Sequence, residues 1–371
     1  MAFYPSLKST ISFIILFISL QNFQVSSAVK GGYWFPDNGL ASSDIDSTLF
    51  THLFCAFANL NLQTNQLIVP SECASFPRTV RGKNSAVKAL LSIGGGNAQS
   101  SDYNNMARNP TSRKTFIDSS INVALANGYD GLDLDWEQQS TVDEMNNLAV
   151  LLREWRAAVR AKASNTGRPQ LILTAALHYS PRANAAATFP AQAIADSLDW
   201  VNVMAYDFVA PAWSPQPFVT QPHASLRNPS STAASGSGGI TAWINAGVPA
   251  KKLVLGFPFY GYAWRLSNPN SNGILAPSTG GDTSVGGGTP SYKQIKDFIS
   301  QRGATVRYDN NYVTNYCYSG STWIAYDDTQ TIATKVAYAK STASLLGYFA
   351  WSLGQDQNWA LSRQASQTWG A

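Results

Sequence analysis

The sequence is poor in charged residues, and this shortage excludes several classes of protein. Lys, Arg, Asp and Glu together make up 13% of the 371 residues, whereas hydrophobic residues make up 44%. Such a composition excludes an intrinsically disordered chain and is ample for one large barrel or two ordinary domains. The formal net charge is only +4 and the basic residues are scattered. No nucleic-acid partner is therefore expected.

Cysteine and histidine are also scarce, with three residues of each. Cys55, Cys73 and Cys317 are too few and too widely spaced to indicate a disulfide framework. Cys55 lies in the apolar run 53–57 and is expected to be a buried free thiol. Cys73 and Cys317 could pair with each other, and the sequence leaves their state open. No His or Cys spacing is typical of a zinc site, so no metal and no cofactor are expected.

Hydrophobic runs long enough to span a membrane are absent as well. The apolar stretch 11–20 is about half as long as the ~20 residues that a membrane-spanning helix needs. Lys8 precedes this stretch and small residues at 25–28 follow it, which is the pattern of a secretory signal peptide cleaved near Ala28 or Val29. We expect a signal peptide over 1–27 and an exported chain over 28–371 without a membrane anchor.

Aromatic residues, by contrast, are plentiful, with 11 Trp, 16 Tyr and 17 Phe. Packing in a hydrophobic core explains many of them. Aromatic rings also pack their faces against flat apolar surfaces such as those of sugar rings. The excess therefore favours a protein that binds carbohydrate.

Short apolar runs alternate with longer amphipathic segments along the chain. The runs are nearly continuous in hydrophobicity, as parallel strands covered on both faces are. The segments 111–126 and 141–163 carry apolar residues at helical spacing. Strand–helix alternation repeated about eight times predicts an α/β fold of the (β/α)8 barrel type, with strands near 31–35, 52–60, 88–94, 131–137, 170–177, 200–206, 252–258 and 347–352.

The interval between the last two predicted strands is much longer than the others. It contains a glycine-rich loop at 280–288, a helical pattern at 292–300, and β-like segments around 305–308 and 322–326. Because the final strand lies beyond it, we expect a small α+β insertion over 263–328 rather than a separate domain. The Ser- and Gly-rich stretch 230–239 is predicted to be a surface loop.

The segment 130–137, Asp-Gly-Leu-Asp-Leu-Asp-Trp-Glu, alternates acidic with apolar residues. On a strand this period of two places Asp133, Asp135 and Glu137 on one face, toward the barrel interior. Like charges at close range push at least one carboxyl toward its neutral form, and a neutral carboxyl at the carboxyl end of a barrel strand is suited to general acid catalysis. A metal site or a solvated acidic edge strand is the alternative, which the interleaved Leu134 and Trp136 disfavour.

This segment resembles the signature of glycoside hydrolase family 18, and the resemblance extends over essentially the whole chain after residue 28. The resemblance implies a retaining hydrolase of chitin, chito-oligosaccharides or other glycans containing N-acetylglucosamine, whose substrate supplies its own nucleophile, the acetamido carbonyl. The segments similar to plant class V chitinases are, in order, Lys30-Gly-Gly-Tyr-Trp-Phe, Thr51-His-Leu-Phe-Cys-Ala-Phe, Ser92-Ile-Gly-Gly, Met204-Ala-Tyr-Asp, Gly256-Phe-Pro-Phe-Tyr-Gly-Tyr-Ala-Trp and Gly347-Tyr-Phe-Ala-Trp.

The resemblance also implies a role for each polar site residue. Glu137 would protonate the leaving glycosidic oxygen and later activate water. Asp135 would hold the acetamido N–H, and Asp133 would tune the proton sharing of Asp135. Tyr206 would donate a hydrogen bond to the acetamido oxygen, with Asp207 supporting that side. Delivery to the apoplast or to the vacuole stays open.

Aromatic residues supply the remaining candidates for substrate contact. Trp351 would form the floor under the reacting sugar, with core packing at the end of the last strand as the alternative. For the other aromatic candidates, packing in the core is at least as good an explanation as contact with substrate. For Arg265, a position on the surface without a role in binding is an equally good explanation. These weaker candidates are Tyr33, Phe57, Trp213, Tyr260, Tyr262, Trp264 and Arg265.

Two departures from the family pattern fall on loops expected beside the cleft. Gln138 and Gln139 follow Glu137 where the plant relatives usually have Tyr-Pro, and Val209 replaces an aromatic residue or His. Losing a ring and polar groups beside the cleft removes stacking and hydrogen bonds, each worth about 1 kcal/mol. The acidic residues are intact, so hydrolysis is the first expectation and a glycan-binding lectin on the same scaffold is the second.

Overall fold

The computed structural model describes residues 28–230 and 234–370. The expected signal peptide over 1–27 lies outside the described residues. Within them, no helix is both long enough and apolar enough to cross a membrane.

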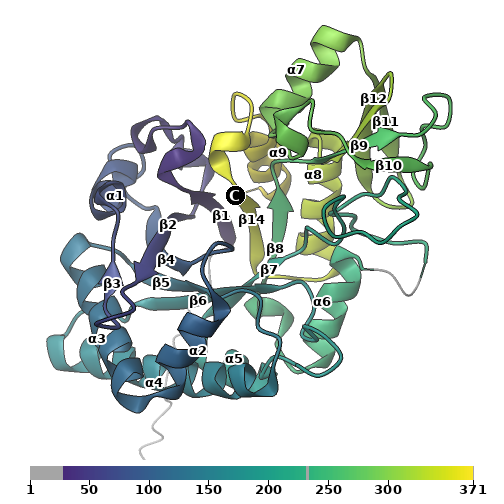
Figure 1. Ribbon diagram of the computed structural model, residues 1–371. Helices are drawn as coiled ribbons and strands as arrows, with labels where there is room; N and C mark the ends of the chain where they lie inside the picture. Colours follow the sequence, from purple (N-terminus) through teal and green to yellow (C-terminus); the bar gives the residue numbers. More distant parts are fainter. Residues whose placement is uncertain (1–27, 231–233, 371) are drawn as a thin grey trace, which may run out of the picture.

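A closed parallel barrel forms the body of the described part of the chain. Its eight strands follow one another in chain order, and the last strand pairs with the first to close the ring. The predicted (β/α)8 barrel is therefore confirmed, as Figure 1 shows in a view into the ring. The barrel strands are β1 (Val29–Trp34), β2 (His52–Leu60), β4 (Lys88–Gly94), β5 (Gly131–Asp135), β6 (Ile172–His178), β7 (Trp200–Met204), β8 (Leu253–Pro258) and β14 (Gly347–Trp351), with the short β3 (Leu67–Ile68) antiparallel to β2.

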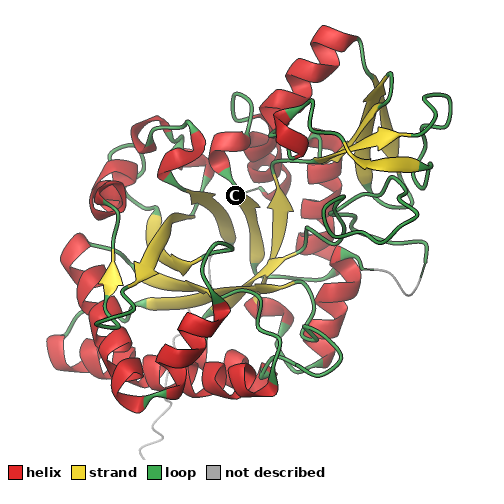
Figure 2. Ribbon diagram, in the orientation of Figure 1, coloured by secondary structure: helices red, strands yellow, loops and turns green. Residues whose placement is uncertain are grey.

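Helices cover the outside of this barrel, as Figure 2 shows. The two long predicted helices begin and end at residues suited to these positions. Asn109 caps α3 by accepting hydrogen bonds from two backbone N–H groups, Thr141 and Glu144 form a capping box on α4, and left-handed Gly128 and Gly167 follow their ends. The helices around the barrel are α1 (Ser71–Arg81), α2 (Ser100–Arg108), α3 (Pro110–Asn127), α4 (Val142–Thr166), α5 (Ala191–Ser197), α6 (Gly236–Asn245), α8 (Thr329–Ala337) and α9 (Ala360–Trp369).

The loop predicted over 230–239 is wrong in its second half, because α6 begins at Gly236. The Ser235 side chain caps this helix by accepting from the N–H of Gly238. Ile240 and Trp243 are then buried against the barrel. Burial of these two side chains outweighs the poor helix propensity of the glycines in the first turn.

Between β8 and β14 the chain leaves the barrel and forms a five-stranded antiparallel sheet in the order β10-β9-β13-β12-β11. The sheet has its own apolar cluster, which includes Trp264, Leu266 and Trp323. Figure 1 shows it with α7 beside the barrel, at the upper right. Its elements are β9 (Tyr262–Leu266), β10 (Ser278–Gly281), α7 (Tyr292–Arg302), β11 (Thr305–Asp309), β12 (Thr314–Ser319) and β13 (Thr322–Tyr326).

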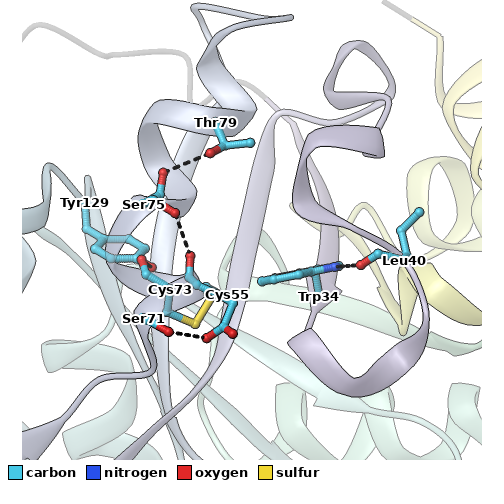
Figure 3. The surroundings of a disulfide bond; sticks show 9 residues. Trp34, Leu40, Cys55, Ser71, Cys73, Ser75, Thr79 and Tyr129 are labelled. Atoms are coloured by element: carbon cyan, nitrogen blue, oxygen red, sulfur yellow. Dashed lines mark hydrogen bonds between the residues drawn. A yellow bond between two sulfur atoms is a disulfide. The ribbon is translucent and has the colours of Figure 1, made fainter.

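A disulfide joins Cys55 on β2 to Cys73 in the first turn of α1, with 5.7 Å between the Cα atoms (Figure 3). The prediction that Cys55 is a free thiol is therefore wrong. The free cysteine among the described residues is Cys317, buried in β12. Folding of α1 back against β2 brings residues 18 positions apart to bonding distance. Tyr129 fixes the same turn by donating its hydroxyl to the carbonyl of Cys73.

Candidate active site

A cavity of about 960 Å³ opens at the carboxyl ends of the barrel strands. This is the end at which (β/α)8 barrels carry their sites, because the loops that follow the strands converge there. Six of the residues predicted from the sequence line it: Phe57, Asp135, Glu137, Tyr206, Asp207 and Trp351.

Strand β5 places the acidic residues as the alternation predicts. Leu132, Leu134 and Trp136 belong to the main hydrophobic core, whereas the Asp133 side chain bonds to residues of β1, β4, β6 and β7 across the barrel interior. The strand ends at Asp135, earlier than the predicted end at residue 137. Glu137 therefore lies on the loop that follows, half-buried at the cavity wall.

Two glycines let the neighbouring backbone approach these carboxyl groups. A Cβ on Gly94 would lie 2.2 Å from the carbonyl oxygen of Asp135, a contact that only glycine avoids. The N–H of Gly95 donates to that same carbonyl at 2.7 Å. One residue further on, Gly96 lies directly against the Glu137 carboxyl. The end of β4 thus fixes the backbone on which both acids are carried.

Asp133 is fully buried and accepts four hydrogen bonds. Its donors are Thr174 Oγ1 at 2.6 Å, Ser92 Oγ at 2.7 Å, Tyr33 Oη at 2.8 Å and Asn202 Nδ2 at 3.3 Å. Burial raises the pKa of Asp133, and the four hydrogen bonds oppose that rise because they stabilise the charged form.

The orientation of Asn202 follows from a neighbouring tryptophan. The indole N–H of Trp200 can only donate, and it lies 2.9 Å from Asn202 Oδ1. The amide NH₂ of Asn202 therefore faces the interior, where it donates to Tyr33 Oη at 2.8 Å as well as to Asp133. Because the Tyr33 hydroxyl accepts this bond, its own proton points to Asp133. Through this series of hydrogen bonds from Trp200, both Asn202 and Tyr33 direct a donor at the Asp133 carboxylate.

Asp135 lies in a contrasting environment two residues along the strand. Its Oδ1 is buried and has no hydrogen-bond partner among the described residues. Burial, then the charges of Glu137 and Asp133, raise the pKa of Asp135 well above its usual value. Of these two neighbouring carboxyls, Asp135 thus holds a proton more firmly than Asp133.

Glu137 is the carboxyl with a pKa near neutrality. Burial first, and then the negative charge of Asp207, raise the pKa of Glu137 to about 7. A carboxyl with a pKa in this range is protonated for a substantial part of the time near neutral pH and gives up its proton readily. Both properties are required of a general acid that later serves as a base.

Tyr206 and Asp207 follow the end of β7 and face the same cavity. Burial, then the charge of Asp135, raises the pKa of Tyr206 well above its usual value, so its hydroxyl remains a donor. Asp207 has a φ of 59°, in the left-handed region, and a side chain that is 40% exposed. Its Oδ1 accepts from Tyr260 Oη at 2.6 Å and lies 3.2 Å from His223 Nδ1.

Trp351 forms an aromatic floor with rings from β1, from β2 and from the residue that directly follows β1. Its ring stacks on Phe57 at 5.6 Å and on Phe35 at 5.7 Å between centroids, and Tyr33 meets it edge-on at 5.5 Å. Trp351 is only half-buried, and with Phe35 and Phe57 it lines the cavity. Such a floor offers a flat apolar surface to a sugar ring.

Several predicted contact residues lie elsewhere. Tyr33 is only 1% exposed and lies beneath the floor, where it holds Asp133. Trp264 is fully buried in the apolar cluster of the antiparallel sheet, so it cannot contact a ligand in the cavity. Arg265 lies on the neighbouring surface and pairs with Asp282 at 3.2 Å. For Tyr33 and Trp264 the alternative of core packing is correct, because their inward-facing positions are filled by protein.

The two departures from the family pattern do not fall on the cavity wall. Gln138 turns outward in a left-handed conformation, with a φ of 63°. Gln139 turns inward and donates to the carbonyl of Trp136 at 2.5 Å. Val209 packs against the antiparallel sheet. None of the three is among the residues that line the cavity.

Sequence reasoning missed several residues that complete the site. Thr174 and Asn202 fall within predicted strands, and the period of two along β6 and β7 places them on the inward face. That signal was available, since a polar residue inside an apolar barrel strand is unusual. His223 carries no local signal, because it lies in a loop and reaches Asp207 only through the tertiary fold.

No group of three or more His, Cys, Asp or Glu among the described residues is arranged to hold a metal ion. On β5, Asp133 instead accepts hydrogen bonds from hydroxyl and amide donors. The Oδ1 atom of Asp135 has no hydrogen-bond partner among the described residues. The expectation that the protein needs no cofactor stays a prediction.

Comparison with known proteins agrees with this geometry. The family model described as glycosyl hydrolases family 18 matches residues 29–356. A class V chitinase of Arabidopsis thaliana is 53% identical over 369 residues, which cover 98% of this chain and 96% of that one. A crystal structure of a class V chitinase mutant from Nicotiana tobaccum in complex with NAG4 matches with a TM-score of 0.90 and 55% identity, covering 93% of this chain and 99% of that one.

A second kind of relative shares the fold. The crystal structure of a chitinase-like agglutinin from Robinia pseudoacacia matches with a TM-score of 0.85 and 48% identity, covering 92% of this chain and 100% of that one. The family model spans most of the chain and a relative more than half identical spans nearly all of it, so this chain belongs to glycosyl hydrolase family 18.

Proposed function

We propose that the chain is a chitinase that hydrolyses β-1,4 links between N-acetylglucosamine units with retention of configuration. The observation that carries this proposal is the unequal pair of carboxyl groups at the end of β5 and on the loop that follows it. Glu137 has a pKa of about 7 at the cavity wall, whereas Asp135 has a pKa raised well above its usual value. A carboxyl that stays protonated is a poor nucleophile, so the pair favours a reaction in which the substrate supplies the nucleophile.

In the first step the Glu137 carboxyl gives its proton to the glycosidic oxygen. The bond between this oxygen and the anomeric carbon breaks, and the oxygen leaves with the bonding electrons and the new proton. The carbonyl oxygen of the substrate's own acetamido group forms the new bond to the anomeric carbon, which gives an oxazolinium ion. Tyr206 remains a hydroxyl donor and lines the cavity, which supports its role as the donor to the acetamido oxygen.

Asp135 is the group that holds the acetamido N–H during this step. Its Oδ1 is buried without a protein partner, so a bond to a substrate N–H would satisfy an atom that otherwise pays a desolvation penalty. As positive charge develops on the oxazolinium ion, a negatively charged Asp135 becomes more favourable. Asp133 accepts four hydrogen bonds and would tune the proton that Asp135 carries.

In the second step Glu137, now a carboxylate, takes a proton from water. The water oxygen attacks the anomeric carbon from the side that the first sugar left, and the acetamido oxygen is released. Two inversions at one carbon give net retention. Trp351, Phe57 and Phe35 would support the reacting sugar from below throughout.

The decisive experiment compares the unaltered protein with Glu137→Gln on N-acetylglucosamine oligomers, with products followed by chromatography. Loss of the general acid should lower kcat at least about 100-fold. Asp118→Asn is the matched control, because it removes an exposed carboxyl on α3 that pairs only with Lys114. Equal turnover by the wild type and Glu137→Gln would contradict the proposal.

A glycan-binding lectin is the second candidate, and the similarity to the Robinia pseudoacacia agglutinin favours it. A lectin would bind the same oligomers without releasing products and would agglutinate cells in a manner that free oligomers inhibit. Absence of turnover by the wild type, together with such agglutination, would replace the first proposal by this one.

The proposed location is the secretory route, with the apoplast or the vacuole as the destination. The disulfide between Cys55 and Cys73 supports it, because such bonds form and persist in oxidising compartments. Expression of the full chain with a C-terminal tag in plant cells tests the proposal. The tagged protein should begin near Ala28 or Val29, and retention of residue 1 on the cellular form would contradict it.

A further inference from the structure

The carboxyl end of β6 carries two ring side chains that the proposed mechanism does not use. His178 is the last residue of this strand, and Tyr179 follows it. Both side chains are half-buried and both line the cavity. Their ring centroids are 4.3 Å apart. The two side chains therefore form one continuous part of the cavity wall, which we call the β6 wall.

The β6 wall is held in place by α6 and by a neighbouring ring. The carbonyl of His178 accepts a hydrogen bond from Trp243 Nε1 at 3.1 Å. A Cβ on Gly239 would lie 2.2 Å from the carbonyl oxygen of Tyr179, so only glycine lets α6 approach this closely. The Tyr179 ring meets Phe208 edge-on, at 4.8 Å between centroids. Side chains fixed before a ligand arrives lower the entropic cost of binding it.

One ring nitrogen of His178 is occupied by the protein itself. Nδ1 lies 3.0 Å from the backbone carbonyl oxygen of Ser180 and 3.3 Å from the backbone nitrogen of the same residue. Because the shorter contact is to an oxygen that can only accept, Nδ1 carries the proton. Burial lowers the pKa of His178, which favours the neutral ring. In a neutral ring with this tautomer, Nε2 is a hydrogen-bond acceptor.

The polar atoms at the tips of the β6 wall are open. Nε2 of His178 and Oη of Tyr179 have no hydrogen-bond partner among the described residues. Neither belongs to the buried polar atoms that lack a partner, so both are accessible. Burial raises the pKa of Tyr179, and its hydroxyl therefore stays a donor. The wall thus offers one acceptor and one donor to a ligand in the cavity.

The place of β6 in the barrel indicates which sugar the β6 wall meets. The floor formed by Trp351, Phe35 and Phe57 comes from β14, from the residue after β1 and from β2. The strand order places β6 across the ring from β1 (Figure 1). Glu137 follows β5, which pairs with β6. The leaving unit is joined through the oxygen that Glu137 protonates, so it lies on the Glu137 side of the floor, beside the β6 wall.

We propose that His178 is a specificity-determining residue that binds the leaving N-acetylglucosamine unit. Its Nε2 accepts a hydrogen bond from an O–H or N–H group of that unit, and Tyr179 Oη donates a second hydrogen bond. The inference rests on the proposed function, because the leaving unit is defined by that reaction. Its consequence is a preference for substrates with a sugar on the leaving side over substrates with an apolar leaving group.

Two amide substitutions separate the two nitrogens of the ring. His178→Asn places an amide near Nδ1 and so keeps the contact with Ser180, whereas His178→Gln, one bond longer, places its amide near Nε2. Tyr179→Phe keeps the ring and removes only the hydroxyl. Asp118→Asn, on the exposed face of α3, is the matched control. Each is compared with the wild type on three substrates that share a chitobiose unit and differ in the leaving group, which is N-acetylglucosamine, glucose or a fluorescent aryl alcohol.

The proposal predicts an effect that depends on the leaving group. With N-acetylglucosamine as leaving group, His178→Asn should lower kcat/KM between about two- and tenfold, and Tyr179→Phe about twofold. His178→Gln should retain most of the activity. With the aryl leaving group all variants should match the wild type. An equal loss on the sugar and aryl substrates, no loss in His178→Asn, or a larger loss in His178→Gln than in His178→Asn would overturn the proposal.

The glucose substrate identifies the donor, because glucose has a hydroxyl in place of the acetamido group. A His178→Asn effect that is lost on this substrate assigns the contact to the acetamido N–H, and one that persists assigns it to a hydroxyl. If the wild type turns over none of the three substrates, the proposed function fails, and titration calorimetry with the N-acetylglucosamine trimer tests the contact. His178→Asn should then weaken binding between about two- and tenfold, and equal affinities would overturn the inference.

Discussion

The carboxylates of Asp133 and Asp207 flank the acid pair Asp135 and Glu137. The two flanking carboxylates are held by different means. Asp133, inside the barrel, is completely buried and accepts four hydrogen bonds from neutral hydroxyl and amide groups. Asp207, at the rim, has a side chain that is 40% exposed and is hydrogen-bonded by two phenols, Tyr260 and Tyr262, and by His223. Each lies next to one of the acids: the charge of Asp133 raises the pKa of Asp135, and that of Asp207 raises the pKa of Glu137.

The difference separates a fixed charge from an adjustable one. The donors to Asp133 are hydroxyl and amide groups of the barrel interior, and the carboxylate is shut off from water. Asp207 is partly exposed, and its charge is the cause, after burial, of the raised pKa of Glu137. The interior carboxylate is therefore fixed by the barrel itself, and the rim carboxylate is where substitution can tune the acidity of Glu137.

The largest effect is expected from Asp133→Asn, which removes the interior charge and places an NH₂ group among donors. The pKa of Asp135 should fall, and Asn202 should lose a hydrogen-bond acceptor. We expect kcat on chito-oligosaccharides to fall about 100-fold and the free energy of unfolding to fall by about 2–3 kcal/mol. Steady-state kinetics and urea denaturation measure the two changes, with Asp118→Asn as control. An unchanged kcat would show that the charge of Asp133 is not needed for catalysis.

Asp207→Asn breaks the rim side of the comparison and should act mainly on pH dependence. In the wild type, activity should fall as pH rises through about 7, because Glu137 must be protonated to act. Without the charge of Asp207 the pKa of Glu137 should fall, and the alkaline limb of kcat/KM should move down by roughly half to one unit. Profiles recorded from about pH 4 to 9 check the sign. A limb that stays in place would mean that Asp207 does not act on Glu137 through its charge.

The raised pKa of Glu137 also has a consequence for stability. The folded state binds this proton more tightly than the unfolded chain, in which the pKa of a glutamate is near its ordinary value of 4.5. The stabilisation is therefore fully present below about pH 4.5 and lost as pH rises through about 7. Comparing the pH dependence of unfolding in wild type and Glu137→Gln isolates it, since the variant should lack this component. Identical curves would place the raised pKa in doubt.

A matched pair of phenol deletions sharpens the comparison. Tyr33→Phe and Tyr260→Phe each remove one hydroxyl that donates to a carboxylate, at 2.8 and 2.6 Å. Because Asp133 is inaccessible to water and Asp207 is partly exposed, we expect about 2 kcal/mol of lost stability for Tyr33→Phe and less than about 1 kcal/mol for Tyr260→Phe. Urea denaturation under one set of conditions decides the order. The reverse order would contradict the assignment of Asp133 as the more dependent carboxylate.

The smallest effect is expected from Thr174→Val, which replaces one interior donor by an apolar group of similar shape. Three donors to Asp133 remain, so the loss should be about 1 kcal/mol of stability with little change in kcat. Thermal unfolding measures the first and initial rates the second. A large loss of activity would show that the number of donors, rather than the charge of Asp133, controls the acid pair.

The acidic strand shows how far periodicity alone leads. Alternation over 130–137 was sufficient to place Asp133 and Asp135 inside and the intervening leucines outside, because a strand turns every second side chain to the same face. The same rule could have found Thr174 and Asn202. It could not show that β5 ends at Asp135, since strand ends depend on the partner strands that supply hydrogen bonds.

Contacts between distant segments were beyond this reasoning. The pairing of Cys55 with Cys73 depends on how α1 folds back on β2, and three cysteines in a sequence allow several pairings. Trp264 and Trp351 are both tryptophans on strands, yet one is fully buried in the antiparallel sheet and the other lines the cavity. The residue type is the same at both positions, and only the neighbours in space differ.

The sequence by itself determined the barrel, the inward acids and the family resemblance, because each depends on residue types repeated at short, regular spacing. The tertiary structure alone decided which carboxyl holds a proton, since that depends on burial and on donors from β1, β4, β6 and β7. It also decided that a loop histidine meets Asp207. Electrostatic free energies are set by distance in space and by exclusion of water, and neither quantity is a property of position along the chain.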